Sequence, residues 1–389
     1  MKKILLVILV CIGSGSVFAN EVTAVWSRLY GQAGSFEHKI VIMNNIASLD
    51  DREIIPVLFE ALKELNIERE NIKGVTERTL QYQLTEIIIN ELGQMKAVEA
   101  ADELFIAYSG MSDNPFMQAS AIKALGDVGA KQYADEIAML LRNINLEVIK
   151  YESRPQMETV IGAAVYSLER MKDDIGFSPV FYAATGRYSK RISDRADRAL
   201  KNMVDDPTEL LTEILNSDKD FNVKAKVLMV EDASDAAAEN KISLVVDALD
   251  QSLLHQPGNS REANATSQVR LDCAAMLIKY GILDLRAVPL LDDMIRGNFS
   301  STETLTAINT LGTSTSDEAA TVLSVYLDEL NEKRKSGYTF QNESIVRATI
   351  GALANTANTI AKPSLLQVEF SGWGGDTRRM AKKALEGLE

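Results

Sequence analysis

The dominant pattern along the chain is helical, with apolar residues recurring at three- and four-residue spacings and polar residues between them. The clearest example is segment 117–129, which places Ala and Leu on one face and ends in the paired glycines Gly126 and Gly129. A second apolar stripe follows over residues 134–141. Because glycine at a helix end accepts the left-handed backbone of a tight stop, this segment predicts a helix–stop–helix unit.

The same unit recurs along the chain. Leu92-Gly93 and Leu311-Gly312 each precede a further amphipathic helix, as Leu125-Gly126 does. Weaker copies are each centred on one apolar residue: Ile46, Leu168, Leu200, Leu228, Leu277, Leu353 and Leu385. Taken in chain order, the spacings between successive anchors are 46, 33, 43, 32, 28, 49, 34, 42 and 32. The shorter spacings are typical of helical-pair repeats, and the longer ones require an insertion.

The unit at 117–141 resembles a HEAT repeat, in particular the short variety first associated with phycobilisome lyases. The resemblance covers nearly all of the chain after Ala19. It implies an all-α fold, a right-handed α-solenoid of about nine to ten HEAT-like helical pairs stacked on one another. No Gly-, Ser- or Pro-rich linker interrupts the pattern, so we predict a single domain over residues 20–389.

Segment 1–19 predicts a signal peptide. It contains a basic start at Lys2-Lys3, an apolar stretch, and the small residue Ala19 at the expected cleavage position. We therefore expect an exported protein without a transmembrane segment, located in a bacterial periplasm or at the cell surface. A lipid anchor on Cys11 is the alternative, although the large residue before it disfavours that processing.

The composition of the chain argues against several classes of function. The chain has 55 acidic and 41 basic residues, a formal charge of −14, which argues against nucleic-acid binding. The two histidines, His38 and His255, lie far apart, and we find no metal, cofactor or catalytic motif. Cys273 is the one cysteine after the signal peptide, within a helical apolar pattern, and we expect it to be buried.

These features predict a non-catalytic scaffold that binds a protein or peptide partner through its concave surface and a loop-bearing edge. Two alternatives stay open: a structural spacer in an envelope machine, and a lyase-like enzyme, which the HEAT resemblance implies. The oligomeric state is left open as well.

Four long connections are predicted between helical pairs, and in a stacked array they emerge from one edge. They are Asn66–Thr76, Asn143–Glu158, His255–Gln268 and Asn331–Ser344. Some carry Tyr, Arg and Lys, and Tyr and Arg are enriched at interface hot spots. The predicted partner-binding residues are Tyr151, Arg154, Lys333, Arg334, Tyr338, Phe340 and, more weakly, Trp373. The alternatives are that exposed loops merely tolerate insertions, and that Trp373 packs over the last core layer.

A basic stripe is predicted on one helix face, where Arg191, Arg195 and Arg198 are spaced at i, i+4 and i+7. In an acidic protein such a stripe suits the docking of an anionic group, either a partner carboxylate or a lipid phosphate. The competing interpretation is pairing with nearby acids such as Asp194 and Asp205.

Overall fold

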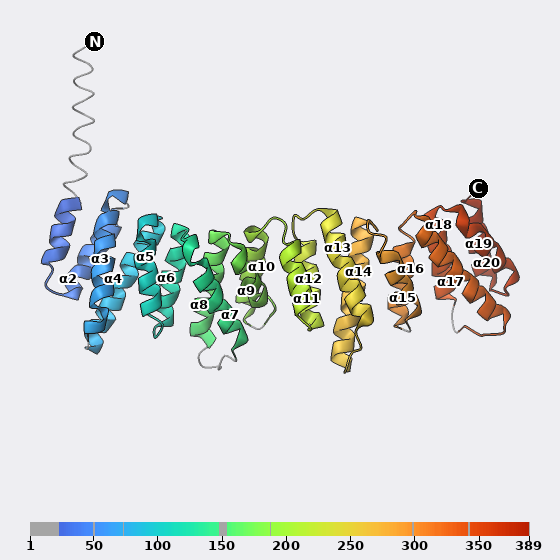
Figure 1. Cartoon of the computed structure of the whole chain (residues 1–389), viewed down its shortest axis with the longest axis horizontal. Helices are drawn as coiled ribbons and strands as arrows, with labels where there is room; N and C mark the ends of the chain where they lie inside the picture. Colours follow the sequence, from blue (N-terminus) through green and yellow to red (C-terminus); the bar gives the residue numbers. More distant parts are fainter. Residues whose placement is uncertain are drawn as a thin grey trace, which may run out of the picture. The chain divides into compact units, whose positions relative to one another are not determined.

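The computed structural model (Figure 1) contains helices and no strands in the part of the chain that it describes. The described residues are 23–49, 51–72, 74–147, 154–186, 188–297, 299–340 and 343–388. Among these residues, no helix combines the length and apolar character needed to cross a membrane. The predicted all-α class is therefore confirmed there. The predicted signal peptide over residues 1–19, with Cys11, lies outside the described residues.

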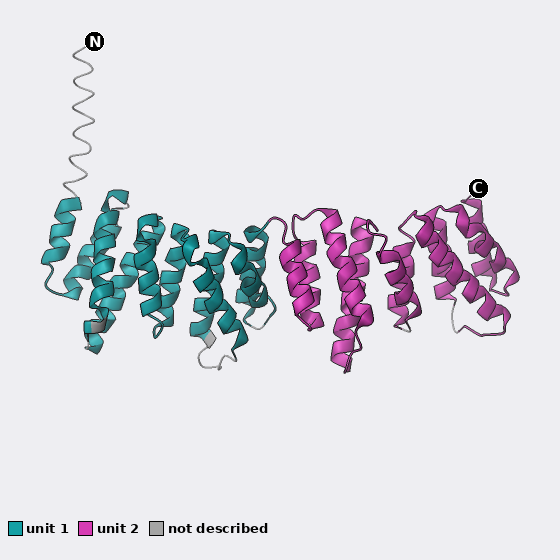
Figure 2. Ribbon diagram, viewed as in Figure 1, with its two compact units in different colours: residues 1–204 teal, residues 205–389 magenta. Residues whose placement is uncertain are grey.

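The chain folds as two compact units, residues 1–204 and residues 205–389 (Figure 2). The sequence predicts that residues 20–389 form a single domain. Whether the two units form one domain stays a prediction.

Unit 1 is built from two layers of helices that alternate along the chain. Layer A consists of α2 (Phe36–Ala47), α4 (Val75–Gln94), α6 (Pro115–Val128), α8 (Arg154–Met171) and α10 (Lys190–Met203), each packed against the next. Layer B consists of α3 (Ile55–Glu68), α5 (Ala101–Gly110), α7 (Ala134–Leu146) and α9 (Phe177–Ala183). Each layer B helix packs against the layer A helix that follows it, and a helix over residues 23–32 precedes α2.

Unit 2 repeats this arrangement. Its layer A consists of α12 (Phe221–Asp232), α14 (Ser260–Tyr280), α16 (Ser301–Leu311), α18 (Ser344–Thr356) and α20 (Gly375–Glu386). Its layer B consists of α11 (Thr208–Ser217), α13 (Ala238–Leu254), α15 (Ala287–Arg296), α17 (Asp317–Lys335) and α19 (Lys362–Gln367). Neighbour-to-neighbour packing of this kind lets each helix bury its apolar stripe against adjacent helices, as in repeat proteins.

Gly129 and Gly312 each follow the end of a helix as predicted, whereas Gly126 does not. Gly129 does end α6, with a left-handed φ of 70°. Gly126, however, lies inside α6, where an added Cβ would come within 2.6 Å of Ser167 in α8. Gly312 follows α16, and a Cβ there would come within 2.7 Å of Ala352 in α18. Gly126 and Gly312 therefore permit close helix approach in layer A.

The connections are shorter than predicted because the helices are longer. The expected loop His255–Gln268 reduces to residues 255–259, since α14 begins at Ser260. In the expected loop Asn331–Ser344, residues 331–335 belong to α17, which continues to Lys335, and Ser344 begins α18. Both connections leave unit 2 at the same edge, the lower one in Figure 1.

Candidate functional site

The layer A face of unit 1 carries an open groove of about 460 Å³, lined by residues of α4, α6, α8 and α10. Space exists there because the helices present small side chains, Ala119 from α6 and Gly162 and Ala163 from α8. Three cationic side chains also line it, Lys123 from α6 and both Arg191 and Arg195 from α10.

The basic stripe predicted from the sequence is partly in this groove. Arg191 and Arg195 line it, whereas Arg198 is exposed and does not. Among the described residues, neither Lys123 nor any of these arginines forms an ion pair, and Asp194 pairs with none of them. The Nε atom of Arg195 is buried without a hydrogen-bond partner. The groove therefore contains positive charge that this unit does not neutralise by contact.

The ring of Tyr166 lies beside two of these cations, Lys123 and Arg195, and beside Arg170. Its ring centroid lies 5.9 Å from Lys123 Nζ, 5.3 Å from Arg170 Cζ and 5.1 Å from Arg195 Cζ. Its hydroxyl donates to Asp127 Oδ1 at 2.5 Å, and burial together with this hydrogen bond raises the pKa of Tyr166. The phenol thus stays neutral at physiological pH, and its π face attracts the surrounding cations.

The acidic residues of the groove have different roles. Glu158 is buried, and its carboxylate accepts from Ser189 N at 2.9 Å and from Ser189 Oγ at 2.6 Å. Ser189 is the N-cap residue of α10, so this contact holds the helix that carries Arg191 and Arg195 against α8. Glu86 is exposed at the groove. Three cations and two carboxylates leave one net positive charge, and one of the carboxylates is already occupied.

A second cluster lies in unit 2 and brings together four of the predicted partner-binding residues. Arg334 donates from Nε to the carbonyl of Gly372 at 3.1 Å, with its Cζ 5.5 Å from the Trp373 ring centroid. The ring centroid of Phe340 lies 5.1 Å from that of Trp373 and 4.9 Å from that of Tyr338. Trp373 is only 3% exposed, while Tyr338 is 60% exposed. Most of this cluster therefore packs against the unit, and its assignment to partner binding stays a prediction.

The other predicted partner-binding residues do not join this cluster's ring contacts. Lys333 is exposed near the end of α17. Arg154 is the first residue of α8, and its side chain is not described; Tyr151 lies outside the described residues.

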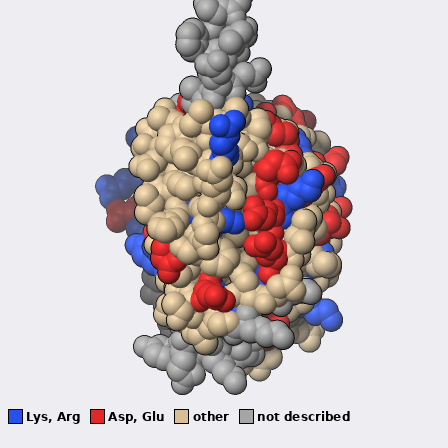
Figure 3. All heavy atoms as spheres, turned by 90° about the vertical axis from the view of Figure 1, so that its left-hand side faces the viewer, with Lys and Arg blue, Asp and Glu red and all other residues tan. Residues whose placement is uncertain are grey.

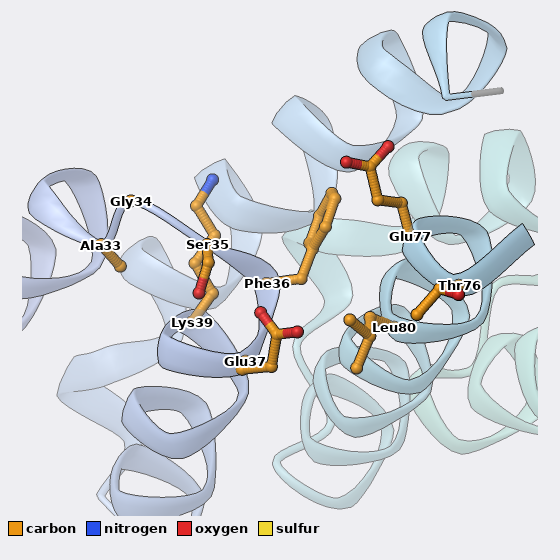
Figure 4. A pocket seen from close by; sticks show the side chains of 9 residues that line it. All are labelled: Ala33, Gly34, Ser35, Phe36, Glu37, Lys39, Thr76, Glu77 and Leu80. Atoms are coloured by element: carbon orange, nitrogen blue, oxygen red, sulfur yellow. The ribbon is translucent and has the colours of Figure 1, made fainter. Parts of the chain in front are cut away.

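Another hollow in unit 1, of about 330 Å³, lies between α2 and α4 (Figure 4). Phe36 and Leu80 line it together with Lys39 and Glu77. Lys39 is already paired with Glu64 at 2.7 Å, so its charge is neutralised by contact. Figure 3, which looks onto the α2 end of unit 1, shows Asp and Glu gathered in a band beside Lys and Arg. The groove differs from the hollow between α2 and α4 because, within the described part of the chain, its cations form no ion pair.

The described residues contain no group of three or more His, Cys, Asp or Glu side chains placed to hold a metal ion. Cys273 is fully buried in α14, as expected from the sequence, and burial raises the pKa of its thiol. A buried neutral thiol is a poor nucleophile.

No protein family model and no curated protein matches this chain. Among solved structures, it is similar to the crystal structure of an engineered protein, with 13% identity and a TM-score of 0.33. That comparison covers 93% of this chain and 98% of the other. A computationally designed self-assembling cyclic homooligomer shares 12% identity at a TM-score of 0.13, covering 78% of this chain and 94% of the other.

Proposed function

We propose that the protein is a non-catalytic interaction scaffold that binds a segment of a partner protein in the groove of unit 1. In this proposal it is an exported, HEAT-like, right-handed α-solenoid of about nine to ten helical pairs, working in a bacterial periplasm or cell envelope.

The observation that carries the proposal is the set of unpaired cations in the groove. Lys123, Arg191 and Arg195 have no ion-pair partner among the described residues, although the whole chain has a formal charge of −14. A partly desolvated guanidinium gains more from an incoming anion than a fully hydrated surface charge does. Arg195, which is half-buried in the groove, would therefore stabilise an anionic side chain of a partner.

The scaffold architecture supports the same function. Four consecutive layer A helices contribute to the groove, so an extended segment lying across them contacts each in turn. The hydrogen bonds of Glu158 to Ser189 fix α10 before any partner arrives. Holding the helix that carries Arg191 and Arg195 in place in advance reduces the entropy lost on binding.

Site-specific photocrosslinking in native envelopes tests the proposal. A photoreactive amino acid at Ser120, which lines the groove, should crosslink one protein that mass spectrometry identifies. The matched control is Ile106, an exposed residue of α5 in layer B of the same unit. Crosslinking of the same proteins from both positions, or of none from Ser120, would contradict groove-mediated scaffolding.

A further inference from the structure

We infer that the two units are copies of one structural unit, and that only the unit 1 copy recognises a ligand, namely an acidic peptide segment. This inference rests on the proposed scaffold function and names the chemistry of its partner.

The helix positions indicate the duplication, because several matching helices of the two units start at the same offset in residue number and the others start within about five residues of it. Among layer A helices, α2 and α12 begin at positions 36 and 221, α4 and α14 at 75 and 260, and α10 and α20 at 190 and 375. The offset is 185 in each case, and the layer B helices α9 and α19, which begin at 177 and 362, share it. Helix order and layer assignment are the same in both units.

A buried asparagine makes the same two contacts in each unit. Asn145 donates from Nδ2 to a backbone carbonyl of α9 at 2.9 Å and accepts from Tyr188 Oη at 2.7 Å. Asn331 donates from Nδ2 to a backbone carbonyl of α19 at 3.3 Å and accepts from Trp373 Nε1 at 2.7 Å. Both asparagines therefore join the end of a layer B helix to the next helical pair. We call this contact the asparagine brace.

A glutamate contact is also shared. Glu158 accepts from the backbone N–H of Ser189, the N-cap residue of α10, at 2.9 Å. Glu343, which follows Glu158 at the same offset as the helices, accepts from the backbone N–H of Gly374, the N-cap residue of α20, at 3.1 Å. The close approach at Gly126 and Gly312 completes the correspondence. The shared contacts are those that hold helices together.

The groove side chains are not shared. In the register set by these contacts, unit 2 has Asn309 for Lys123, Arg347 for Gly162, Gly351 for Tyr166, Asp376 for Arg191, and Met380 for Arg195. Met380 Cε lies 3.2 Å from the position that a Cβ on Gly351 would take, so it packs over that residue. Asp376 is paired with Arg379. The unit 2 counterpart therefore lacks the three cations and the aromatic ring of the groove, although it has the same asparagine brace.

The remaining charges favour a carboxylate ligand. With Glu86 and Glu158 present, the groove has one net positive charge, which suits a monoanionic carboxylate better than a doubly charged phosphate. Phe116, 57% exposed, lines the same groove and offers an apolar surface beside the cations. A peptide with Asp or Glu next to an apolar side chain matches both features.

The test replaces two groove residues of unit 1 by the residues at the corresponding positions of unit 2. The variant Arg191→Asp/Arg195→Met is compared with Lys201→Met, an exposed residue of α10 outside the groove. The probe is a fluorescein-labelled peptide that alternates Glu and Leu, with its Gln–Leu counterpart as the neutral control, measured by anisotropy at low ionic strength. We expect the double variant and the neutral peptide each to weaken binding by about tenfold or more, which corresponds to loss of a charge-assisted contact. Lys201→Met should bind as the wild type does.

Circular dichroism and the melting temperature establish that the double variant is folded. Equal binding of the Glu–Leu and Gln–Leu peptides by the wild type, or equal binding by the wild type and the folded double variant, overturns the inference. Binding of the wild type to anionic phospholipid vesicles but not to the Glu–Leu peptide also overturns it. If crosslinking at Ser120 identifies a partner that the double variant still captures, the scaffold function stands and the acidic-peptide inference fails. Peptide binding without a crosslinked partner would support the acidic-peptide inference and contradict the scaffold function.

Discussion

A buried ion pair in unit 2 allows a quantitative test of how the layer A helices are held together. Arg270 of α14 contacts Glu303 of α16 at 2.7 Å (Nε to Oε1), and their side chains are 7% and 4% exposed. Arg270 also donates from Nη1 to the carbonyl of Ser252 at 2.9 Å and lies 4.1 Å from the ring centroid of Phe299. Glu303 forms a capping box with Ser300 at the start of α16.

The substitution Glu303→Met leaves the guanidinium of Arg270 buried without its carboxylate. Removing one partner of a buried pair costs about 3–5 kcal/mol of folding free energy, and loss of the cap adds about 1 kcal/mol. The double variant Arg270→Met/Glu303→Met removes both charges, so we expect a total loss of only about 1–2 kcal/mol, mostly from the cap. Unit 1 has Thr85 and Met117 at the corresponding positions, both buried, so this backbone accommodates an uncharged pair.

Urea unfolding followed by tryptophan fluorescence measures these losses. Replacing Trp26 by Phe in every variant leaves Trp373 as the reporter, so the emission follows unit 2. Hydrogen bonds from Ser300 and Arg270 outweigh burial and lower the pKa of Glu303. Because the folded pKa is depressed, the stabilisation by Glu303 is present above the unfolded pKa and disappears as the pH falls through the folded value. A double variant less stable than Glu303→Met, or a loss from Glu303→Met that does not shrink in acid, would refute the reasoning.

Three further predictions concern buried polar groups. The thiol of Cys273 should not react with Ellman's reagent in the folded protein and should react fully in guanidinium chloride; rapid native reaction would contradict its burial. Asn331→Ala should cost about 2–3 kcal/mol by leaving Trp373 Nε1 unpaired, whereas Tyr338→Ala should cost less than about 1 kcal/mol. Urea unfolding measures both, and equal losses would exclude the brace. Burial raises the pKa of Glu231 above its ordinary value of 4.5, so the folded state binds the carboxyl proton more tightly than the unfolded state does. Stability therefore falls as the pH rises from the unfolded pKa through the folded pKa. Glu231→Gln should therefore raise the melting temperature at neutral pH but not in acid, and a decrease at neutral pH would contradict the expected desolvation.

The sequence predicted helices well where they bury an apolar stripe. Segment 117–141 shows this, because α6 and α7 each have one apolar face packed against neighbours. The predicted loop over residues 260–268 is wrong, because these residues form the first turns of α14. Those residues are largely polar and show no apolar stripe. The side chain of Asn259 accepts from Glu262 N at 3.0 Å and caps the helix, a local signal that the periodicity did not include.

The candidate site was predicted only in part, for a different reason. The spacing of Arg191 and Arg195 places them on one helix face, and the sequence showed this directly. It did not show that Lys123 and Tyr166, from two other helices, lie beside them. Which helix faces meet depends on tertiary packing, here on the close approach of α6 and α8 at Gly126. The unpaired Nε of Arg195 likewise has no signature in a single sequence.

The inferred duplication, in contrast, has a signal in the sequence, which is the series of spacings between anchors and not any single anchor. From Ile46 to Leu200 the anchor spacings are 46, 33, 43 and 32, and from Leu228 to Leu385 they are 49, 34, 42 and 32. The two series agree closely because connection lengths are constrained by where each helix must dock. Side-chain identity is less constrained. Asn145 and Asn331 form the same brace in both units, whereas Met380 stands in α20 where α10 has Arg195. Since the same order and packing of helices occur with and without the basic groove, the groove cations are not required for this arrangement, which supports the proposal that they serve binding.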